Sequence, residues 1–328
     1  MTIAPTPTKR GNAIRITPRT AIVLTIASIA GLAMFLWPLF ASPSPESAAH
    51  SGDAPLIFAV TLPFVVAVVL AEMTSGGLDS KALAMLGVLS AINAALRPLG
   101  AGTAGIETVF FMLVLAGRVF GPGFGFVLGC TSLFASALLT AGVGPWLPFQ
   151  MLASAWVGLG AGLLPQRVRG RREIVMLAGY GVFSAYAFGF LMNMWFWPFL
   201  ADSESMVGPA FVPGDGILDN LHRFFVFTML TSTFGWDTGR AITNCVAIVL
   251  VGPAVLAALR RASRKAAFEA PIVFEPARAD SDRPRAGTAE VAGTAGTAGT
   301  TAGTAAAEGK APPKGDGTAH SRTRDRNR

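Results

Sequence analysis

Seven charged or amide side chains lie inside or at the edges of apolar segments of this sequence, where polar groups are costly and are functional candidates by default. They are Arg97, Glu107, Gln150, Asn193, Asp237, Arg240 and Asn244. A guanidinium donates hydrogen bonds, a carboxylate accepts them and an amide does both, so such a set could bind a polar solute. Structural pairing is the alternative, of Arg97 with Glu107 and of Asp237 with Arg240.

Aromatic residues near these groups could supply the walls of a binding site. A large amphipathic solute needs a mostly apolar pocket with a few placed polar groups. We predict Trp146, Trp197 and Trp236 as walls, although Trp146 could also be an ordinary anchor at the membrane surface. The predicted substrate-binding residues are Arg97, Glu107, Trp146, Gln150, Asn193, Trp197, Arg223, Trp236, Asp237 and Arg240.

Motifs of enzymes and nucleotide-binding proteins are missing from the sequence. It contains no GxxxxGK[ST] loop, no HExxH and no GxSxG. Its three histidines are far apart, and Cys130 and Cys245 lie in apolar segments, where we expect packing residues. We therefore predict no enzymatic activity, no cofactor and no metal site. Such a chain must obtain energy from a partner or work passively.

The composition is that of a membrane protein. The mean hydropathy is +0.53, with 52% apolar and 14% charged residues, which does not fit a water-soluble chain of 328 residues. Although the pI is near 10.1, the basic residues flank apolar segments, so the charge does not indicate nucleic-acid binding.

Eight apolar segments approach the roughly 20 residues that a membrane-spanning helix needs. Backbone groups in lipid must be satisfied within the chain, so each segment is predicted to be a helix and the fold class to be all-α and polytopic. Phe224–Leu230 is too short to span and is predicted to lie in the outer leaflet as a lid. The predicted spans are 20–40, 55–71, 81–97, 106–120, 124–140, 150–165, 174–198 and 241–259.

The distribution of basic residues predicts the orientation. Of the 26 Lys and Arg residues, 23 fall in blocks that these spans place on one face, which the positive-inside rule makes cytoplasmic. Both termini are therefore predicted to be cytoplasmic in a multi-pass protein of the cell membrane. The exceptions, Arg97, Arg223 and Arg240, would lie near the outer face, where a solute from outside would arrive.

Composition divides the chain into four predicted parts. The last part contains a Gly/Thr/Ala repeat with almost nothing to bury, so it is predicted to be disordered. The parts are a basic cytoplasmic N-terminus (1–19), two extra membrane spans (20–80), a six-helix membrane core (81–262) and a low-complexity cytoplasmic tail (263–328).

The third predicted span carries a ridge of small residues. Gly87, Ala91 and Ala95 recur every four residues and so share one helix face. Small residues at this spacing let another helix approach closely. The ridge could therefore pack inside the protein or dock a partner membrane protein.

From Lys81 to about Arg261 the chain resembles the substrate-binding S component of energy-coupling factor (ECF) vitamin transporters. The resemblance rests on the Lys-led helix with the small-residue ridge that ends in LRPLG, on FGPGFGFVLG at 120–129, and on TAGVGPWLPFQMLASAWVGLGAGLLP at 140–165. The sequence as a whole is most similar to the cobalamin-type branch of this family. The two N-terminal spans and the Gly/Thr/Ala tail depart from the minimal family pattern.

The resemblance implies a six-helix core that captures a vitamin or similar micronutrient from outside. It also implies partners, namely a transmembrane coupling subunit and two ATPase subunits. The family's docking motif, an alanine-spaced ridge, would correspond to Gly87, Ala91 and Ala95, with Gly in place of the first Ala.

Two other functions remain open at this level. The chain could be a membrane enzyme that acts on a lipid or isoprenoid through Glu107, Asp237 and Arg240, which would require an acid–base or metal site that the sequence does not show. It could also be a structural or assembly protein of the membrane.

Overall fold

The computed structural model describes residues 14, 16–40, 63, 66, 67, 70, 71, 80–100, 105–200, 209–212 and 214–266. These residues form helices, with no strand in the described part of the chain, and the predicted all-α membrane fold is confirmed. The elements are α1 (Pro18–Phe35), α2 (Trp37–Phe40), α4 (Ser80–Leu96), η2 (Arg97–Leu99), α5 (Val109–Phe120), α6 (Pro122–Leu139), α7 (Leu147–Leu163), α8 (Arg171–Phe196), η3 (Trp197–Leu200), α9 (Ile217–Thr228), η4 (Met229–Asp237), α10 (Thr238–Leu250) and α11 (Gly252–Ala266).

The described residues contain three candidate membrane spans, or four if a bent pair of helices forms one span. Helices α1, α6 and α8 are long and apolar enough to cross a membrane, and α4, α5 and α7 are apolar but shorter. The continuous helix 217–250 and α11 form a pair bent by 65°. Six predicted spans coincide with described helices, whereas most of 55–71 and nearly all of the tail 263–328 lie outside the described residues.

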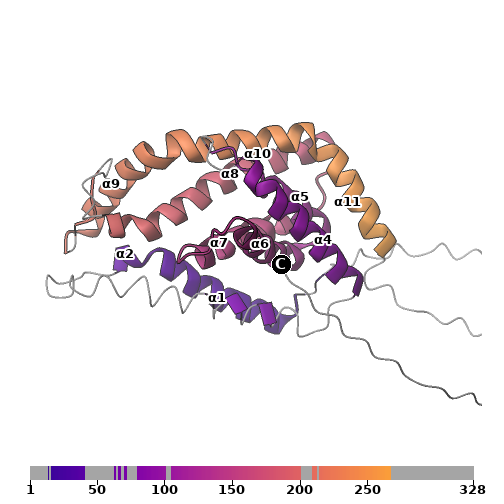
Figure 1. The fold of residues 1–328 in the computed structure, drawn as a ribbon, viewed down its shortest axis with the longest axis horizontal. Coiled ribbons are helices and arrows are strands. Elements are labelled where there is room, and N and C mark those ends of the chain that lie inside the picture. Colours follow the sequence, from indigo (N-terminus) through magenta and orange to yellow (C-terminus); the bar gives the residue numbers. More distant parts are fainter. Residues whose placement is uncertain are drawn as a thin grey trace, which may run out of the picture. The chain divides into compact units, whose positions relative to one another are not determined.

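The C-terminal helices differ from the sequence prediction. Helix α9 continues through the π-helical η4 into α10 without a break, as the orange ribbon of Figure 1 shows. The predicted lid Phe224–Leu230 is therefore wrong as a separate helix, because it lies inside this long one. The predicted span 241–259 is also interrupted after Leu250. Pro253 explains the bend, since it lacks an N–H and its ring clashes with the preceding turn.

Glycines allow the central helices to pack backbone against backbone. A Cβ at Gly125 of α6 would collide with the carbonyl oxygen of Gly158 of α7, and one at Gly158 would collide with that of Gly125. Gly117 of α5 meets the same Gly158 carbonyl. Helix α5 can be only 12 residues long because 11 of these are buried among other helices rather than exposed to lipid.

The antiparallel helices give the bundle two ends that hold different polar groups. At one end, called here the Arg240 end, α4 finishes and α5, α7 and α10 begin. At the other, called the Glu173 end, Arg118 of α5 donates to Glu173 Oε1 (2.7 Å) at the start of α8, and Arg260 of α11 donates to the same oxygen (2.6 Å). Arg118 also donates to the carbonyls of Leu164 and Val168, at 3.0 and 2.8 Å. The Glu173 end thus contains an ionic cluster in which both arginines bind the same carboxylate.

Helix α1 lies outside the segment that resembles a known family, yet it packs on the core. Figure 1 shows α1 at one side of the bundle, and its Phe35 contacts Phe149 of α7 edge to face with ring centroids 5.0 Å apart. The indole N–H of Trp156 donates to Ser28 Oγ at 3.0 Å. The first predicted span is therefore attached to the helical bundle.

Candidate functional site

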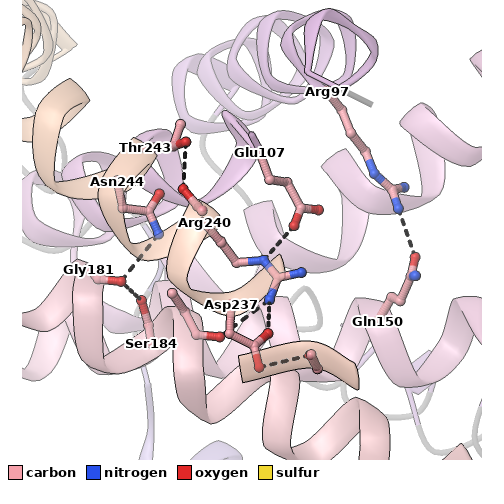
Figure 2. A network of polar contacts seen from close by, with 12 residues as sticks. Arg97, Glu107, Gln150, Gly181, Ser184, Asp237, Arg240, Thr243 and Asn244 are labelled. Atoms are coloured by element: carbon pink, nitrogen blue, oxygen red, sulfur yellow. Dashed lines mark hydrogen bonds and ion pairs between the residues drawn. The ribbon is translucent and has the colours of Figure 1, made fainter. Parts of the chain in front are cut away.

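Arg240 is the centre of a buried network at the Arg240 end (Figure 2). Its Nε donates to Glu107 Oε2 at 2.6 Å, and its Nη1 donates to Asp237 Oδ1 at 2.8 Å. The guanidinium also lies over the rings of Phe110 and Phe188, 5.5 and 5.0 Å from their centroids. The three charged side chains are only 11%, 20% and 2% exposed in the order Arg240, Glu107, Asp237. Two carboxylates thus share one cation in a low-dielectric setting.

The π-helical segment positions Asp237. An insertion of this type widens one helical turn and is frequent at functional sites. Ser232 Oγ donates to Asp237 Oδ2 at 2.8 Å, and Thr238 Oγ1 donates to the Thr233 carbonyl at 2.6 Å. A Cβ at Gly189 of α8 would overlap the Asp237 carboxylate. The glycine therefore creates the room in which this carboxylate lies.

Glu107 is held by the turn that joins α4 to α5. It lies two residues before α5, where a negative charge interacts favourably with the helix dipole. The neighbouring Thr108 Oγ1 donates to the Leu96 carbonyl at 2.7 Å, which ties this turn to the end of α4. Gly105, with a φ of 78°, lies against the backbone of Trp236, so the turn also contacts η4.

Arg97 and Gln150 form a second contact at the same end (Figure 2). Arg97 Nη2 donates to Gln150 Oε1 at 3.0 Å. The possible Arg97–Glu107 pair is absent, because Arg97 contacts Gln150 and Glu107 binds Arg240. The possible Asp237–Arg240 pair is present. Among the described residues no carboxylate pairs with Arg97. Its charge is therefore balanced less completely than that of Arg240.

Buried amides extend the polar surface away from Arg240. Asn244, one turn further along α10, donates to the Gly181 carbonyl at 3.2 Å, and Ser184 donates to the same carbonyl at 3.0 Å. Within the described structure, Asn244 Oδ1 and Asn193 Nδ2 are buried without a hydrogen-bond partner. Buried polar atoms are nearly always paired, so each of these amides retains capacity to bind a further group.

The three predicted aromatic walls differ in their exposure to solvent. Trp146 caps the start of α7, four residues before Gln150, and is 42% exposed. Trp236 is also exposed and precedes Asp237. Trp197 is fully buried, and its indole N–H donates to the Pro209 carbonyl at 3.1 Å. Its ring packs in an apolar cluster with Met194, Phe211, Phe224 and Phe227.

Arg223 is likewise apart from the network. It pairs with Asp215, and its Nη1 lies 3.3 Å from Asn220 Oδ1. The Arg223 and Asp215 side chains are 30% and 37% exposed. The contact lies at the surface of α9, and no described contact links it to Arg240 or Arg97.

Sequence reasoning missed several residues of the network. Ser232 and Gly189 orient or accommodate Asp237, and Ser184 donates to the Gly181 carbonyl that Asn244 also contacts. Phe110 and Phe188 lie against the Arg240 guanidinium. The two rings could not have been selected from a sequence with 23 phenylalanines. The serines carried a weak signal as small polar residues inside apolar segments, but their partners lie on another turn or helix.

The small-residue ridge of α4 faces away from the described helices. Gly87, Ala91 and Ala95 are all exposed, and a Cβ at Gly87 would meet nothing within 4 Å. The opposite face contacts α6, where Ser90 Oγ lies 2.7 Å from Thr131 Oγ1 and Asn93 Nδ2 donates to Ser132 Oγ at 3.0 Å. The internal contacts of α4 therefore leave the ridge uncovered by any described helix.

No group of three or more His, Cys, Asp or Glu side chains in the described part of the chain could hold a metal ion. The groups of the network are one guanidinium, two carboxylates, amides and hydroxyls. Such groups can bind and orient a polar solute through hydrogen bonds and charge.

Residues 81–233 match a family model described as ECF transporter, substrate-specific component. The matched segment begins at the second residue of α4 and ends within η4, so it includes Arg97, Glu107 and Gln150 but not Asp237 or Arg240. Neither a curated protein nor a solved structure matches the chain.

Proposed function

We propose that this chain captures a vitamin or related micronutrient at the Arg240 end of its bundle, because residues 81–233 match the family model of ECF transporter substrate-specific components. The family is one of transporter subunits rather than enzymes, and it implies a small-molecule substrate and partner subunits of the importer. Cobalamin is the first ligand to test, because the sequence as a whole resembles the cobalamin-type branch.

The polar arrangement at the Arg240 end is the observation that carries this proposal. Arg97 and Gln150 come from different helices and are joined by a hydrogen bond of 3.0 Å, and the exposed Trp146 lies one helical turn before Gln150. Their remaining hydrogen-bonding groups and this ring can contact a solute that is part polar and part apolar. Arg240 helps to hold the helices of this end together, because it joins α10 to Glu107 just before α5.

The orientation follows from the charge distribution. The Glu173 end carries exposed Arg167, Arg169, Arg171 and Arg172, so the positive-inside rule makes it cytoplasmic and the Arg240 end external. A solute from outside would then meet Arg97, Gln150 and Trp146 first. The chain would lie in the cell membrane with both termini in the cytoplasm.

The exposed ridge on α4 supports the partner part of the proposal. A transmembrane coupling subunit that acts with two ATPase subunits would approach Gly87, Ala91 and Ala95 closely, because these side chains are small and no described helix covers them. The energy for release of the solute would come from these ATPases, since the sequence has no nucleotide-binding loop of its own.

The enzyme alternative finds less support in the geometry. Glu107 and Asp237 both bind Arg240, and Asp237 also accepts from Ser232, so the two carboxylates are engaged with protein partners. A general base must instead reach a proton of the substrate. The network is better suited to binding than to proton transfer.

Mass spectrometry of the small molecules that remain bound to the purified chain tests the proposal directly. We expect one retained micronutrient, with cobalamin examined first, and equilibrium binding of that compound by the purified chain. The matched variants Gln150→Ala and Gln166→Ala then locate the site, because Gln166 bonds to carbonyls near the opposite end of the bundle. Absence of any bound or binding solute would contradict the proposed function.

A further inference from the structure

A groove between α1 and the core is separate from the polar network. It has a volume of about 590 Å³, and its lining includes Ala21, Leu24, Thr25 and Leu32 of α1 with Leu159 and Leu163 of α7. Trp156 and Ser28 also line it, and their polar atoms bond to each other at 3.0 Å. The groove therefore offers an almost wholly apolar surface, in the size range of small-molecule sites.

The length of the groove fits one leaflet of a membrane. Ala21 and Leu32 are 11 residues apart on α1, which corresponds to about 17 Å at 1.5 Å per residue. Half of a hydrocarbon core of about 30 Å is about 15 Å. A single hydrocarbon chain that enters at the bundle end can thus lie along the groove within its own leaflet.

One end of the groove lies at the Glu173 end. Leu163 is the last residue of α7 and Pro122 is the first residue of α6, and both line the groove. The next residue after Leu163, Leu164, accepts a hydrogen bond from Arg118 of the ionic cluster. This end therefore lies where the helices leave the apolar layer.

Exposed cations follow this end of the groove directly. Arg167 is four residues beyond Leu163, and a chain of four residues spans at most about 14 Å. Arg169, Arg171 and Arg172 follow in the same connection and are also exposed. Glu173 does not neutralise them, because Arg118 and Arg260 already bind it. An apolar groove thus ends beside a concentrated positive charge.

We infer that the groove and the α7–α8 connection together bind an anionic phospholipid. One acyl chain lies against α1 and α7, and the phosphate contacts Arg167 and Arg169. A single ligand can occupy the groove and contact the arginines only if it joins a hydrocarbon chain to an anionic group at the depth of the membrane surface. An anionic phospholipid has this structure. This inference does not rest on the proposed solute site.

Native mass spectrometry of the full chain with phosphatidylglycerol and phosphatidylcholine of identical acyl chains tests the inference. Thr25→Phe fills the groove at an exposed lining position, and Ile26→Phe is its control, since Ile26 is exposed on the same helix but does not line the groove. We expect wild type and Ile26→Phe to retain phosphatidylglycerol preferentially, and Thr25→Phe to lose retention of both lipids.

The headgroup contact is tested by the double variant Arg167→Gln/Arg169→Gln against Arg261→Gln/Arg264→Gln. All four arginines are exposed, but the second pair lies on α11, which does not line the groove. We expect the first variant alone to reduce the preference for phosphatidylglycerol, by about thirtyfold if each arginine contributes about 1 kcal/mol. Unchanged thermal stability would show that each variant is folded.

Photo-crosslinking with phosphatidylglycerol that carries a diazirine on its acyl chain reports the location. We expect labelled peptides from α1 and from 156–163. The inference would be overturned if Thr25→Phe and Ile26→Phe retained lipid equally, or if the two double arginine variants showed the same preference for phosphatidylglycerol. Labels spread over exposed positions such as Phe134, Leu138 and Val175 would contradict it as well. Occupation of the groove by the micronutrient or by a helix of a partner subunit, seen as loss of these labels when either is added, would also overturn it.

Discussion

Arg240 Nε donates to Glu107 Oε2 at 2.6 Å across 133 residues of sequence. This contact joins the first turn of α10 to the turn before α5, and Asp237 binds the same guanidinium from three residues away. Loss of Arg240 would leave two buried carboxylates without their cation. Loss of Glu107 would leave Arg240 with Asp237.

The first prediction concerns this asymmetry. Arg240→Met should destabilise the bundle by about 3–5 kcal/mol, because removal of one partner of a buried ion pair leaves an uncompensated buried charge. Glu107→Gln should cost less. Thermal unfolding of the purified variants measures the difference. Arg223→Met is the control, since that pair is about one-third exposed and such contacts contribute about 0–1 kcal/mol. Equal stability of all three variants would show that the network does not hold the fold.

The second prediction concerns solute capture. Gln150→Ala and Trp146→Ala should each weaken binding, and for Gln150 the loss of one polar contact of about 1–3 kcal/mol corresponds to roughly five- to hundred-fold. Gln166→Ala should bind as the wild type does. Equilibrium binding and thermal stability are measured together. If Gln150→Ala and Trp146→Ala retain full affinity at unchanged stability, the start of α7 is not part of the site.

The third prediction concerns partner docking. Gly87→Leu and Ala91→Leu should weaken co-purification with the coupling subunit and leave solute binding intact, because a filled ridge prevents close helix approach. Gly179→Leu is a matched control, since a Cβ at either glycine meets nothing within 4 Å. Normal complex formation by the two ridge variants would instead place the coupling subunit on another surface.

The fourth prediction concerns the ionic cluster at the Glu173 end. Glu173→Gln should lower the free energy of unfolding by about 3–5 kcal/mol, because it removes the acceptor charge of both Arg118 and Arg260, and Arg118 is 2% exposed. Asp219→Asn, at an exposed position in the first turn of α9, should have little effect. A stable Glu173→Gln variant would mean that the carbonyls of Leu164 and Val168 satisfy Arg118 sufficiently.

The fifth prediction concerns topology. Cysteines introduced at Ser47 and Ser205 should react with impermeant thiol reagents from outside intact cells, and Arg169→Cys should not, because the basic connection is expected to be cytoplasmic. Ser47 and Ser205 lie outside the described residues. Labelling of Arg169→Cys from outside would reverse the orientation and place the Arg240 end in the cytoplasm.

The local sequence determined where the helices of this protein form and where several of them begin. Long apolar segments become helices because lipid offers no partner to a free backbone N–H or C=O. Proline and glycine then set several boundaries, as at Pro18, Pro122 and Gly170, because proline suits the first turn of a helix and glycine adopts a positive φ. Arg97, Glu107 and Arg240 could be selected as site candidates from their unusual position in apolar sequence, but their contacts could not be predicted.

Tertiary structure decided which groups meet. Arg97 contacts Gln150 rather than Glu107, Trp197 is buried in an apolar cluster, and Asp237 owes its position to a π-helical segment and to Gly189. Each outcome depends on which helices are neighbours and how closely they approach. Hydropathy and helical periodicity specify the faces of single helices, whereas the choice of partner is made by packing between helices that are far apart in sequence.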